Sequence, residues 1–374
     1  MQYRTFGRTG IRMSALGFGA MRLPMTPDDQ HVDEEKAIPV IRRAYELGVN
    51  YFDTAPYYCK SESEIVLGKA IKPFRDQIYV STKNPIDNGD GVVFRQKLEE
   101  SLRKLDCGWI DFYHMWGISW KSYEEHITAK DGPLAQARRA KEEGLIRHIS
   151  YSFHDTPEAL LRLIDTGNFE SMTVQYNLLD RANEQAIQHA HEAGMGVVIM
   201  GPVGGGRLSG YSEQIRQLLP NGFGGNADLA LRFVLAHPGV SVALSGMSTI
   251  EMVEQNAATV SRPEGLSAEE RRQIAQALDE LKRLADLYCT GCQYCMPCPN
   301  DVNIPQIFEF MNYHRVYGLT EHARAQYALL GTNHEWIKGE NASACLECGE
   351  CEGKCPQHLN IIEQLKEAHR TLGA

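Results

Sequence analysis

Long apolar runs are missing from this sequence, and so is an excess of basic residues. No window approaches the roughly 18 apolar residues of a membrane span. The first residues, Met1 to Gly7, contain no apolar stretch that could act as a signal peptide. The formal net charge of −10 disfavours nucleic acid as the main partner, because phosphate backbones bind basic surfaces. We therefore expect a cytoplasmic protein that acts on neither membranes nor nucleic acids.

Cysteine is scarce in most of the chain. Cys59 and Cys107 are isolated, and we expect both to be small packing residues. The other eight cysteines form two runs near the C-terminus that each end in Cys-Pro: Cys289, Cys292, Cys295 and Cys298, then Cys345, Cys348, Cys351 and Cys355. Clustered thiols in a chain without an export signal indicate a reducing compartment rather than a disulfide framework.

The second run has the C-x2-C-x2-C-x3-C-P spacing with which bacterial ferredoxins hold [4Fe–4S] clusters. Three closely spaced thiolates can bind one cluster, and the fourth ligand then comes from the distant run. We predict two clusters with crossed ligands, one held by Cys289, Cys292, Cys295 and Cys355, the other by Cys345, Cys348, Cys351 and Cys298. The first run departs from the spacing, since only Met296 and Pro297 separate its last two cysteines. Zinc, which paired C-x2-C units also suit, is the alternative.

From about residue 14 to 258, short apolar or β-branched runs alternate with amphipathic helical stretches. Eight strand–helix units in roughly 250 residues predict an α/β protein with a closed (β/α)8 TIM barrel. The strands should begin near Leu16, Val49, Ile78, Asp111, Ile146, Met172, Gly196 and Val242. An open doubly wound sheet is the alternative, but the turn from Gly17 to Arg22 lacks the third glycine of a dinucleotide-binding turn. Residues 2–13 resemble a hairpin that precedes the barrel.

A second, smaller domain follows the barrel. Pro263 and Gly265 end the alternating pattern, and Ser267 with Glu270 forms a capping box for a helix that reaches about Leu287. Further helical patterns, at 304–316 and 321–330, lie between the cysteine runs. We therefore predict a barrel domain over residues 1–265, followed over residues 266–374 by a linker helix and a small, mainly α-helical, ferredoxin-like iron–sulfur domain.

Three polar residues lie where adjacent barrel strands should end. Asp53 and Tyr58 follow the second strand, and Lys83 ends the third. Barrel enzymes carry catalytic residues at the C-terminal ends of strands. The Lys83 ammonium, held by Asp53, should favour tyrosinate and so lower the pKa of Tyr58 from about 10. A tyrosine tuned in this way can exchange a proton with an alkoxide, although each residue alone would suit a structural role.

At these segments the sequence resembles the aldo-keto reductase family. The resemblance covers residues 1 to about 260 and rests on Asp53-Thr54-Ala55-x-x-Tyr58, Ser81-Thr82-Lys83, Ile110-Asp111-Phe112-Tyr113, Val174-Gln175-Tyr176-Asn177 and Glu254-Gln255-Asn256. With the cysteine module attached, the chain looks like the bacterial and archaeal subgroup that fuses such a reductase to a ferredoxin domain. The resemblance implies NAD(P)H-dependent reduction of a carbonyl to an alcohol, or the reverse, by hydride transfer from the nicotinamide.

The same resemblance implies roles for individual residues. Tyr58 would be the general acid, tuned by Asp53 and Lys83. Ser152 and Gln175 would contact the carboxamide of the cofactor, and Asn256 would contact its adenine. The remaining expected cofactor contacts come from residues near other strand ends: Gly19, Met21, Met200, Gly201 and Gly246. Met200 stands where relatives stack a tyrosine on the nicotinamide, and the glycine run 201–206 with Arg207 could wrap the pyrophosphate.

The family's catalytic histidine would fall five residues after Asp111, where this chain has Trp116. Three residues could take its place. A bulge could bring His114 into the site, Trp116 could act through its indole N–H, and His154 lies at the end of the fifth strand. Trp116 with Trp120 and Tyr123 could also form an aromatic wall for the substrate.

The cofactor end departs from the family as well. Gly246 and Met252 stand where relatives carry Lys and Arg for the 2′-phosphate of NADP, so the choice between NADP and NAD stays open.

We predict an oxidoreductase that acts on a small carbonyl or alcohol with NADP or NAD and carries two [4Fe–4S] clusters. A nicotinamide moves two electrons as hydride, whereas a cluster moves one at a time, and we find no convincing flavin motif that would split the pair. The alternative is an iron–sulfur electron-transfer protein whose barrel docks a one-electron redox partner or another cofactor. A third hypothesis is a degenerate barrel that serves as a binding module.

Overall fold

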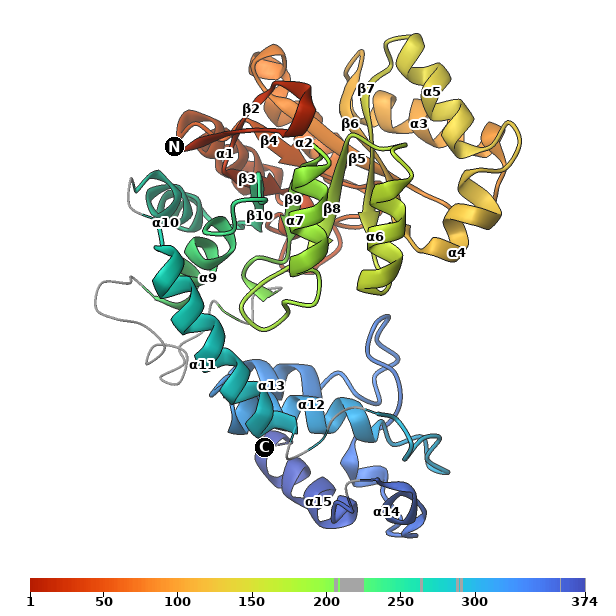
Figure 1. Ribbon diagram of the computed structural model, residues 1–374, viewed down its shortest axis with the longest axis vertical. Helices are drawn as coiled ribbons and strands as arrows, with labels where there is room; N and C mark the ends of the chain where they lie inside the picture. The colour runs from red at the N-terminus through yellow and green to blue at the C-terminus, as the bar shows by residue number, and fades with distance from the viewer. Residues whose placement is uncertain are drawn as a thin grey trace. The chain divides into compact units, whose positions relative to one another are not determined.

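The computed structural model describes residues 1–204, 208, 225–262, 265–286, 289, 292–356 and 358–373. The chain divides into two compact units, one of Met1–Gly204 with Ala230–Ser267 and one of Gly205–Leu229 with Ala268–Ala374. Figure 1 shows the barrel of the first unit and the helices of the second. In the described ranges, every helix is too short or too polar to cross a membrane.

Eight parallel strands of the first unit close into a barrel in the order β10-β3-β4-β5-β6-β7-β8-β9. Their bounds are β3 Leu16–Gly19, β4 Tyr51–Asp53, β5 Tyr79–Pro85, β6 Ile110–Ile118, β7 Ile146–Phe153, β8 Ser171–Gln175, β9 Gly196–Met200 and β10 Val242–Gly246. The predicted (β/α)8 barrel is confirmed, and each strand begins close to its predicted residue. The parallel pairing brings all the strand C-terminal ends to one rim of the barrel.

Helices follow the strands and cover the outside of the barrel (Figure 1). Their bounds are α1 Glu34–Glu46, α2 Ser63–Ile71, α3 Gly91–Leu105, α4 Trp120–Ser122, α5 Pro133–Glu142, α6 Pro157–Asp165, α7 Glu184–Glu192, α9 Asn226–Leu235 and α10 Ile250–Ser261. Short turns of helix η1 Gly7–Thr9, η2 Ala20–Arg22, η3 Lys72–Gln77 and η4 Tyr123–Ile127 complete the connections. Side-chain caps fix several helix starts: Asp90 accepts from two amides of α3, and Thr249 accepts from the Met252 amide of α10.

The predicted hairpin is confirmed as β1 Tyr3–Thr5 and β2 Arg12–Ser14, which pair antiparallel. Phe6, in the turn, is fully buried against residues near the strand starts, and its ring meets that of Phe112 edge-on with the centroids 4.9 Å apart. A Cβ on Gly196 would lie 2.4 Å from the Phe6 ring, so only glycine fits there. The hairpin therefore closes the N-terminal end of the barrel.

A buried ion cluster lies at the same N-terminal end. Asp111 is fully buried and binds Arg75 at 2.7 Å and Arg147 at 3.0 Å. Both guanidinium groups also lie over the Trp109 ring, at 4.7 and 4.4 Å from its centroid. The amide of Val80 donates to the same carboxylate at 2.9 Å. Because every oxygen of Asp111 has a partner, this end of the barrel is built for stability.

The second unit is helical in its described residues, as the sequence predicted for a small iron–sulfur module. Its helices are α11 Ala268–Asp286, α12 Ile304–Arg315, α13 Thr320–Tyr327, η6 Ala342–Ala344, α14 Glu350–Lys354 and α15 Ile361–Leu372. α12 packs against both α13 and α15. The Tyr327 hydroxyl lies 2.9 Å from His369 Nδ1 and accepts from the amide of Ala342, which ties α13 and α15 to the segment just before Cys345.

Candidate active site and iron–sulfur sites

Asp53 and Lys83 form a buried ion pair at the C-terminal rim of the barrel. Lys83 Nζ donates to Asp53 Oδ1 at 2.6 Å and to the Thr54 carbonyl at 2.7 Å. The Ser81 hydroxyl donates to the other oxygen of Asp53, also at 2.6 Å. Burial alone would lower the pKa of Lys83, but Asp53 and Tyr58 raise it by more, so its pKa lies above the usual value. The lysine is therefore a fixed positive charge beneath the rim.

Tyr58 lies in the loop that follows β4, and its ring centroid is 4.8 Å from Lys83 Nζ. Burial raises the pKa of Tyr58 above its usual value, and the opposing effect of Lys83 is smaller. The prediction that Lys83 lowers this pKa below 10 is therefore wrong in direction, because the sequence could not show how much of the phenol is removed from water. A half-buried tyrosine with a raised pKa stays protonated at neutral pH and can donate a proton.

The loop after Tyr58 has a strained backbone. Cys59, Lys60 and Ser61 all adopt left-handed conformations, with φ of 51°, 55° and 69°. Non-glycine residues avoid this region, at a cost of about 1–2 kcal/mol each. The Cys59 thiol points back to the loop after β3, 3.4 Å from the Met21 carbonyl. Three such residues in succession let the chain reverse directly behind Tyr58 and enter α2.

Two of the three candidates for the position of the family's histidine, His114 and Trp116, lie on β6. This strand directs alternate side chains into the barrel. His114 is fully buried beside Tyr51, whose hydroxyl is 3.5 Å from its Nε2, and burial lowers its pKa to about 4. Its Nδ1 has no hydrogen-bond partner within the described residues. The irregularity in β6 falls between Met115 and Ile118, after His114, so it does not carry His114 to the rim.

Trp116, two residues further along β6, lies at the rim. Its ring meets the Tyr58 ring edge-on, with the centroids 5.8 Å apart, and also contacts Tyr57 at 5.6 Å. His154 is exposed in the loop after β7, near Gly117. Of the three histidine-position candidates, Trp116 is the one whose ring lies against Tyr58.

The predicted aromatic wall is divided between two places. Trp120 and Tyr123 pack on each other with centroids 5.3 Å apart, and Arg162 lies over Trp120 at 3.8 Å. Trp116 packs with Tyr57 and Tyr58 instead. Tyr57, which the sequence analysis did not select, is 60% exposed at this rim.

The expected cofactor residues gather at the ends of β3 and of β7 to β10. Ser152 is buried and accepts from the Gly117 amide at 2.8 Å. Gln175 pairs with Met200 across β8 and β9, and a Cβ on Gly201 would lie 2.7 Å from its Oε1. Gly201 has φ of 62°, so glycine is needed there for conformation as well as for space. The Gln175 amide therefore packs directly against the backbone of Gly201. Gly205, Gly206 and Arg207 lie outside the described residues.

The other cofactor residues lie around the closing seam of the barrel. Gly246 of β10 pairs with Gly19 of β3, and Asn256 donates to Ser245 at 3.2 Å. Met21, in η2, is 55% exposed. Arg22, which the sequence analysis did not select, lies across Gly246: a Cβ there would be 3.4 Å from its Cδ.

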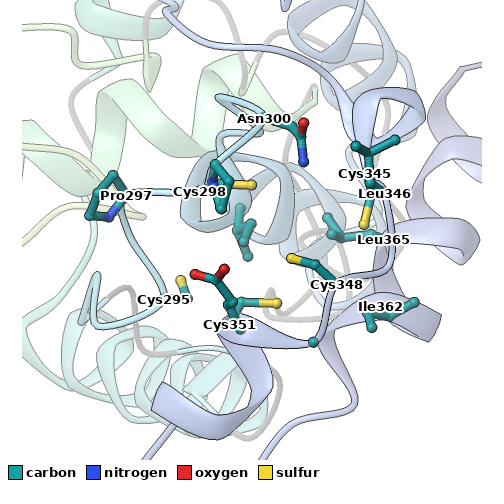
Figure 2. Close-up of a pocket in the computed structure, with 14 residues that line it drawn as sticks. Cys295, Pro297, Cys298, Asn300, Cys345, Leu346, Cys348, Cys351, Ile362 and Leu365 are labelled. Atoms are coloured by element: carbon teal, nitrogen blue, oxygen red, sulfur yellow. The ribbon is translucent and has the colours of Figure 1, made fainter.

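Two cavities in the second unit each gather four of the predicted cysteine ligands. One is lined by Cys298, Cys345, Cys348 and Cys351, whose sulfur atoms point inward in Figure 2. The other is lined by Cys289, Cys292, Cys295 and Cys355. Cys295 and Ile304 line both cavities. Each cavity therefore draws three cysteines from one run and at least one from the other, with Cys295 shared between them.

The electrostatics of these thiols suit a group that supplies positive charge. Burial and the neighbouring sulfurs of Cys289, Cys292 and Cys351 raise the pKa of Cys295 to about 11. Thiolates packed this closely repel one another, so binding iron must displace protons. Sulfur donors within an apolar shell that includes Leu365, Phe308 and Ile361 suit iron–sulfur ligation.

Comparison with known proteins agrees with this geometry. The aldo/keto reductase family pattern matches residues 15–279, and a 4Fe-4S dicluster domain matches residues 288–360. The chain belongs to the aldo/keto reductase family. It joins that reductase to a ferredoxin-like domain, as the motifs predicted.

Two curated relatives of this aldo-keto reductase match over most of their length. L-galactose dehydrogenase of Arabidopsis thaliana is 27% identical over 76% of this chain and 96% of its own. The NADH-specific methylglyoxal reductase of Escherichia coli is 25% identical over 73% of this chain and 98% of its own. Both names describe oxidoreductases, which supports an oxidoreductase role for the barrel.

Solved structures share the barrel as well. An aldo-keto reductase from Bacillus halodurans in its holo form has a TM-score of 0.65 and 29% identity, covering 74% of this chain and 96% of that one. An aldo/keto reductase from Klebsiella pneumoniae in complex with NADP and acetate has a TM-score of 0.61 and 25% identity, covering 74% and 94%. Structural relatives of this barrel therefore include one with bound NADP.

Proposed function

We propose that this aldo-keto reductase reduces a small carbonyl compound to an alcohol, or catalyses the reverse, with NADP or NAD bound at the C-terminal rim of the barrel. The observation that carries this proposal is the position of Lys83. Its ammonium is buried, bound to Asp53 at 2.6 Å, and lies 4.8 Å from the centre of the Tyr58 ring. A proton donor next to a fixed cation suits the protonation of a carbonyl oxygen that gains negative charge.

Tyr58 acts as the general acid in this scheme. A bound reduced nicotinamide would supply the hydride to the carbonyl carbon. Tyr58 donates its proton to the carbonyl oxygen, and the charge of Lys83 stabilises the tyrosinate that remains. Asp53 holds Lys83 by accepting its hydrogen bond on one carboxylate oxygen at 2.6 Å, and Ser81 fixes Asp53 by donating to the other oxygen at 2.6 Å. In the oxidative direction the tyrosinate takes the proton of the alcohol.

Trp116 takes the position next to Tyr58 that the family gives to a histidine. Its edge-on contact fixes the plane of the Tyr58 ring and keeps water from one side of it. With His114 buried and His154 exposed, Trp116 is the residue that shapes the substrate side of Tyr58.

The cofactor would be held by residues at the strand ends. Gln175 and Ser152 would take the carboxamide, Met200 and Gly201 would lie along the ring, and Asn256 would lie near the adenine. One relative is named NADH-specific and another contains NADP, so either dinucleotide suits the family. We propose two [4Fe–4S] clusters with the crossed ligands that line the two cavities. Clustered cysteines of this kind support a reducing, cytoplasmic location.

A second candidate function is one-electron transfer by the C-terminal domain to a redox partner. Cys292 and Cys348 are exposed, one at each cavity, which supports access to both clusters from outside. This activity could run beside the carbonyl chemistry, but no flavin motif connects two-electron and one-electron steps.

Anaerobic binding measurements test the main proposal directly. Protein purified without oxygen is titrated with NADH and with NADPH, and bound cofactor is then followed during turnover with a panel of aldehydes and ketones. We expect saturable binding and carbonyl-dependent oxidation of the nicotinamide. If neither NADH nor NADPH binds, the result would favour the electron-transfer function instead.

A further inference from the structure

Arg22 lies at the C-terminal rim of the barrel, beside the end of β10. It is the last residue of η2, just after β3, and it is exposed. Its aliphatic stem lies across Gly246, the last residue of β10. A Cβ on Gly246 would be 3.4 Å from Cδ of Arg22 and 3.5 Å from both Cβ and Cγ. These are ordinary van der Waals distances, so the stem of the arginine packs beside the end of β10.

This placement brings a permanent positive charge to a region where basic residues are missing from the expected positions. Gly246 and Met252 stand where the family places Lys and Arg for a cofactor phosphate. Met252 is 43% exposed and its amide is capped by Thr249, at the start of α10. The barrel closes where β10 pairs with β3, and Gly246 pairs there with Gly19. This pairing places Arg22, which follows β3, next to Gly246, although the two residues lie at opposite ends of the barrel sequence.

We propose that Arg22 binds a phosphate group of the dinucleotide cofactor, in place of the basic residues absent at positions 246 and 252. The inference rests on the proposed function, since it requires that a nicotinamide dinucleotide binds at this rim. A guanidinium is the side chain best matched to phosphate, because its planar fork can donate two parallel hydrogen bonds.

The dinucleotide offers two phosphate sources, the pyrophosphate and the 2′-phosphate of NADP. Both NADH and NADPH carry the first, and only NADPH carries the second. Removing the guanidinium therefore weakens both cofactors equally if it binds the pyrophosphate, and weakens NADPH alone if it binds the 2′-phosphate. Either pattern supports the proposal and identifies the phosphate.

The test uses the full-length anaerobic protein and measures dissociation constants for NADH and NADPH by calorimetry, without a substrate. The variants are Arg22→Ala and Arg22→Lys, with Arg103→Ala as the matched control. Arg103 is an arginine on α3 whose side chain is 74% exposed. We expect Arg22→Ala to weaken binding about 10- to 100-fold, because the loss of a hydrogen bond between charged groups reduces affinity by about this factor. Arg22→Lys should recover part of the loss, and Arg103→Ala should match the wild type.

The outcomes separate this inference from the proposed function. If the wild type binds a cofactor and Arg22→Ala binds it equally tightly, Arg22 is not a phosphate ligand, while the proposed function stands. If the wild type binds neither cofactor, both ideas fail together. Circular dichroism and iron content, which should not change in Arg22→Ala, establish that a loss of affinity does not come from unfolding.

Discussion

Trp116 stands edge-on to Tyr58, with the two ring planes at 87° and their centroids 5.8 Å apart. In the proposed correspondence with the family, an indole stands on the side of the acid where relatives would have an imidazole. An indole cannot change its charge between pH 5 and 8, whereas a histidine can. In the proposed mechanism, the proton chemistry is then left to Tyr58 and its buried ion pair.

Replacing Tyr58 with phenylalanine removes the proposed proton donor and little volume. We expect turnover to fall about 10²- to 10⁴-fold, the usual contribution of general acid catalysis, with the cofactor dissociation constant nearly unchanged. Tyr57→Phe is the control, because this neighbour is 60% exposed and its hydroxyl has no proposed role in proton transfer. Near-full activity of Tyr58→Phe on a verified substrate would show that the acid lies elsewhere.

His114 should make the barrel sensitive to mild acid. Its pKa is about 4 in the folded chain and about 6.5 when unfolded, because burial disfavours the charged ring. Below pH 6.5 the unfolded chain binds a proton that the folded chain does not, so stability falls as the pH decreases from 6.5 to 4. Between pH 7 and pH 5 this amounts to about 2 kcal/mol.

The measurement is urea unfolding at both pH values, followed by tryptophan fluorescence, since Trp109, Trp116 and Trp120 all lie in the barrel. His114→Gln has no ionisable group at this position and should lose most of the pH dependence in that window. An unchanged pH dependence in the variant would assign the effect to other groups.

Asp111 should matter for stability and not for catalysis. Asp111→Asn leaves the buried Arg75 without its charged partner, and we expect a loss of about 3–5 kcal/mol in the free energy of unfolding. The control is Asp106→Asn, which removes an exposed pair with Lys72 and should cost less than about 1 kcal/mol. Turnover per folded molecule should stay the same in both variants, because the ion pairs of Asp111 lie at the end of the barrel opposite to Tyr58.

Protein made without oxygen should contain about eight irons per chain and lose its colour in air. Paired substitutions test the crossed ligands. Cys292→Ala with Cys355→Ala should remove one cluster and leave about four irons, because both residues line one cavity. Cys292→Ala with Cys348→Ala should remove both clusters, and Cys107→Ala should remove neither. Stoichiometric zinc without iron in anaerobic protein would contradict the cluster assignment.

Cys59→Gly should stabilise the barrel. Cys59 has φ of 51°, a conformation that glycine adopts without strain, so we expect a gain of about 1 kcal/mol in the free energy of unfolding. Cys107→Gly is the control and should destabilise, since Cys107 does not have a left-handed backbone and glycine adds freedom to the unfolded chain. Urea unfolding gives the free energy of unfolding of both variants. A loss of stability in Cys59→Gly would show that the contacts of the Cys59 thiol outweigh the backbone strain.

The sequence was sufficient for features that repeat or that depend on spacing. Regular alternation of strand and helix patterns predicted the barrel, and the ferredoxin-like cysteine spacing predicted the residues that line the two cavities, except that Cys295 lines both. The pKa of Tyr58 could not be predicted, because its direction depends on the balance between burial and the charge of Lys83. Arg22 was missed because it meets Gly246 only when the last strand closes against the first.

The hairpin that contains Phe6 determines from which side ligands can reach the barrel. With one end of the barrel sealed by an aromatic ring that fits against Gly196, the rim that carries Tyr58 is the entrance that the hairpin leaves open. In the proposed function, a dinucleotide and a carbonyl compound would share that rim, and the one that binds deeper would bind first and leave last. Because the interior of such a barrel is packed core and the hairpin covers its other end, both ligands would bind and leave from the same side.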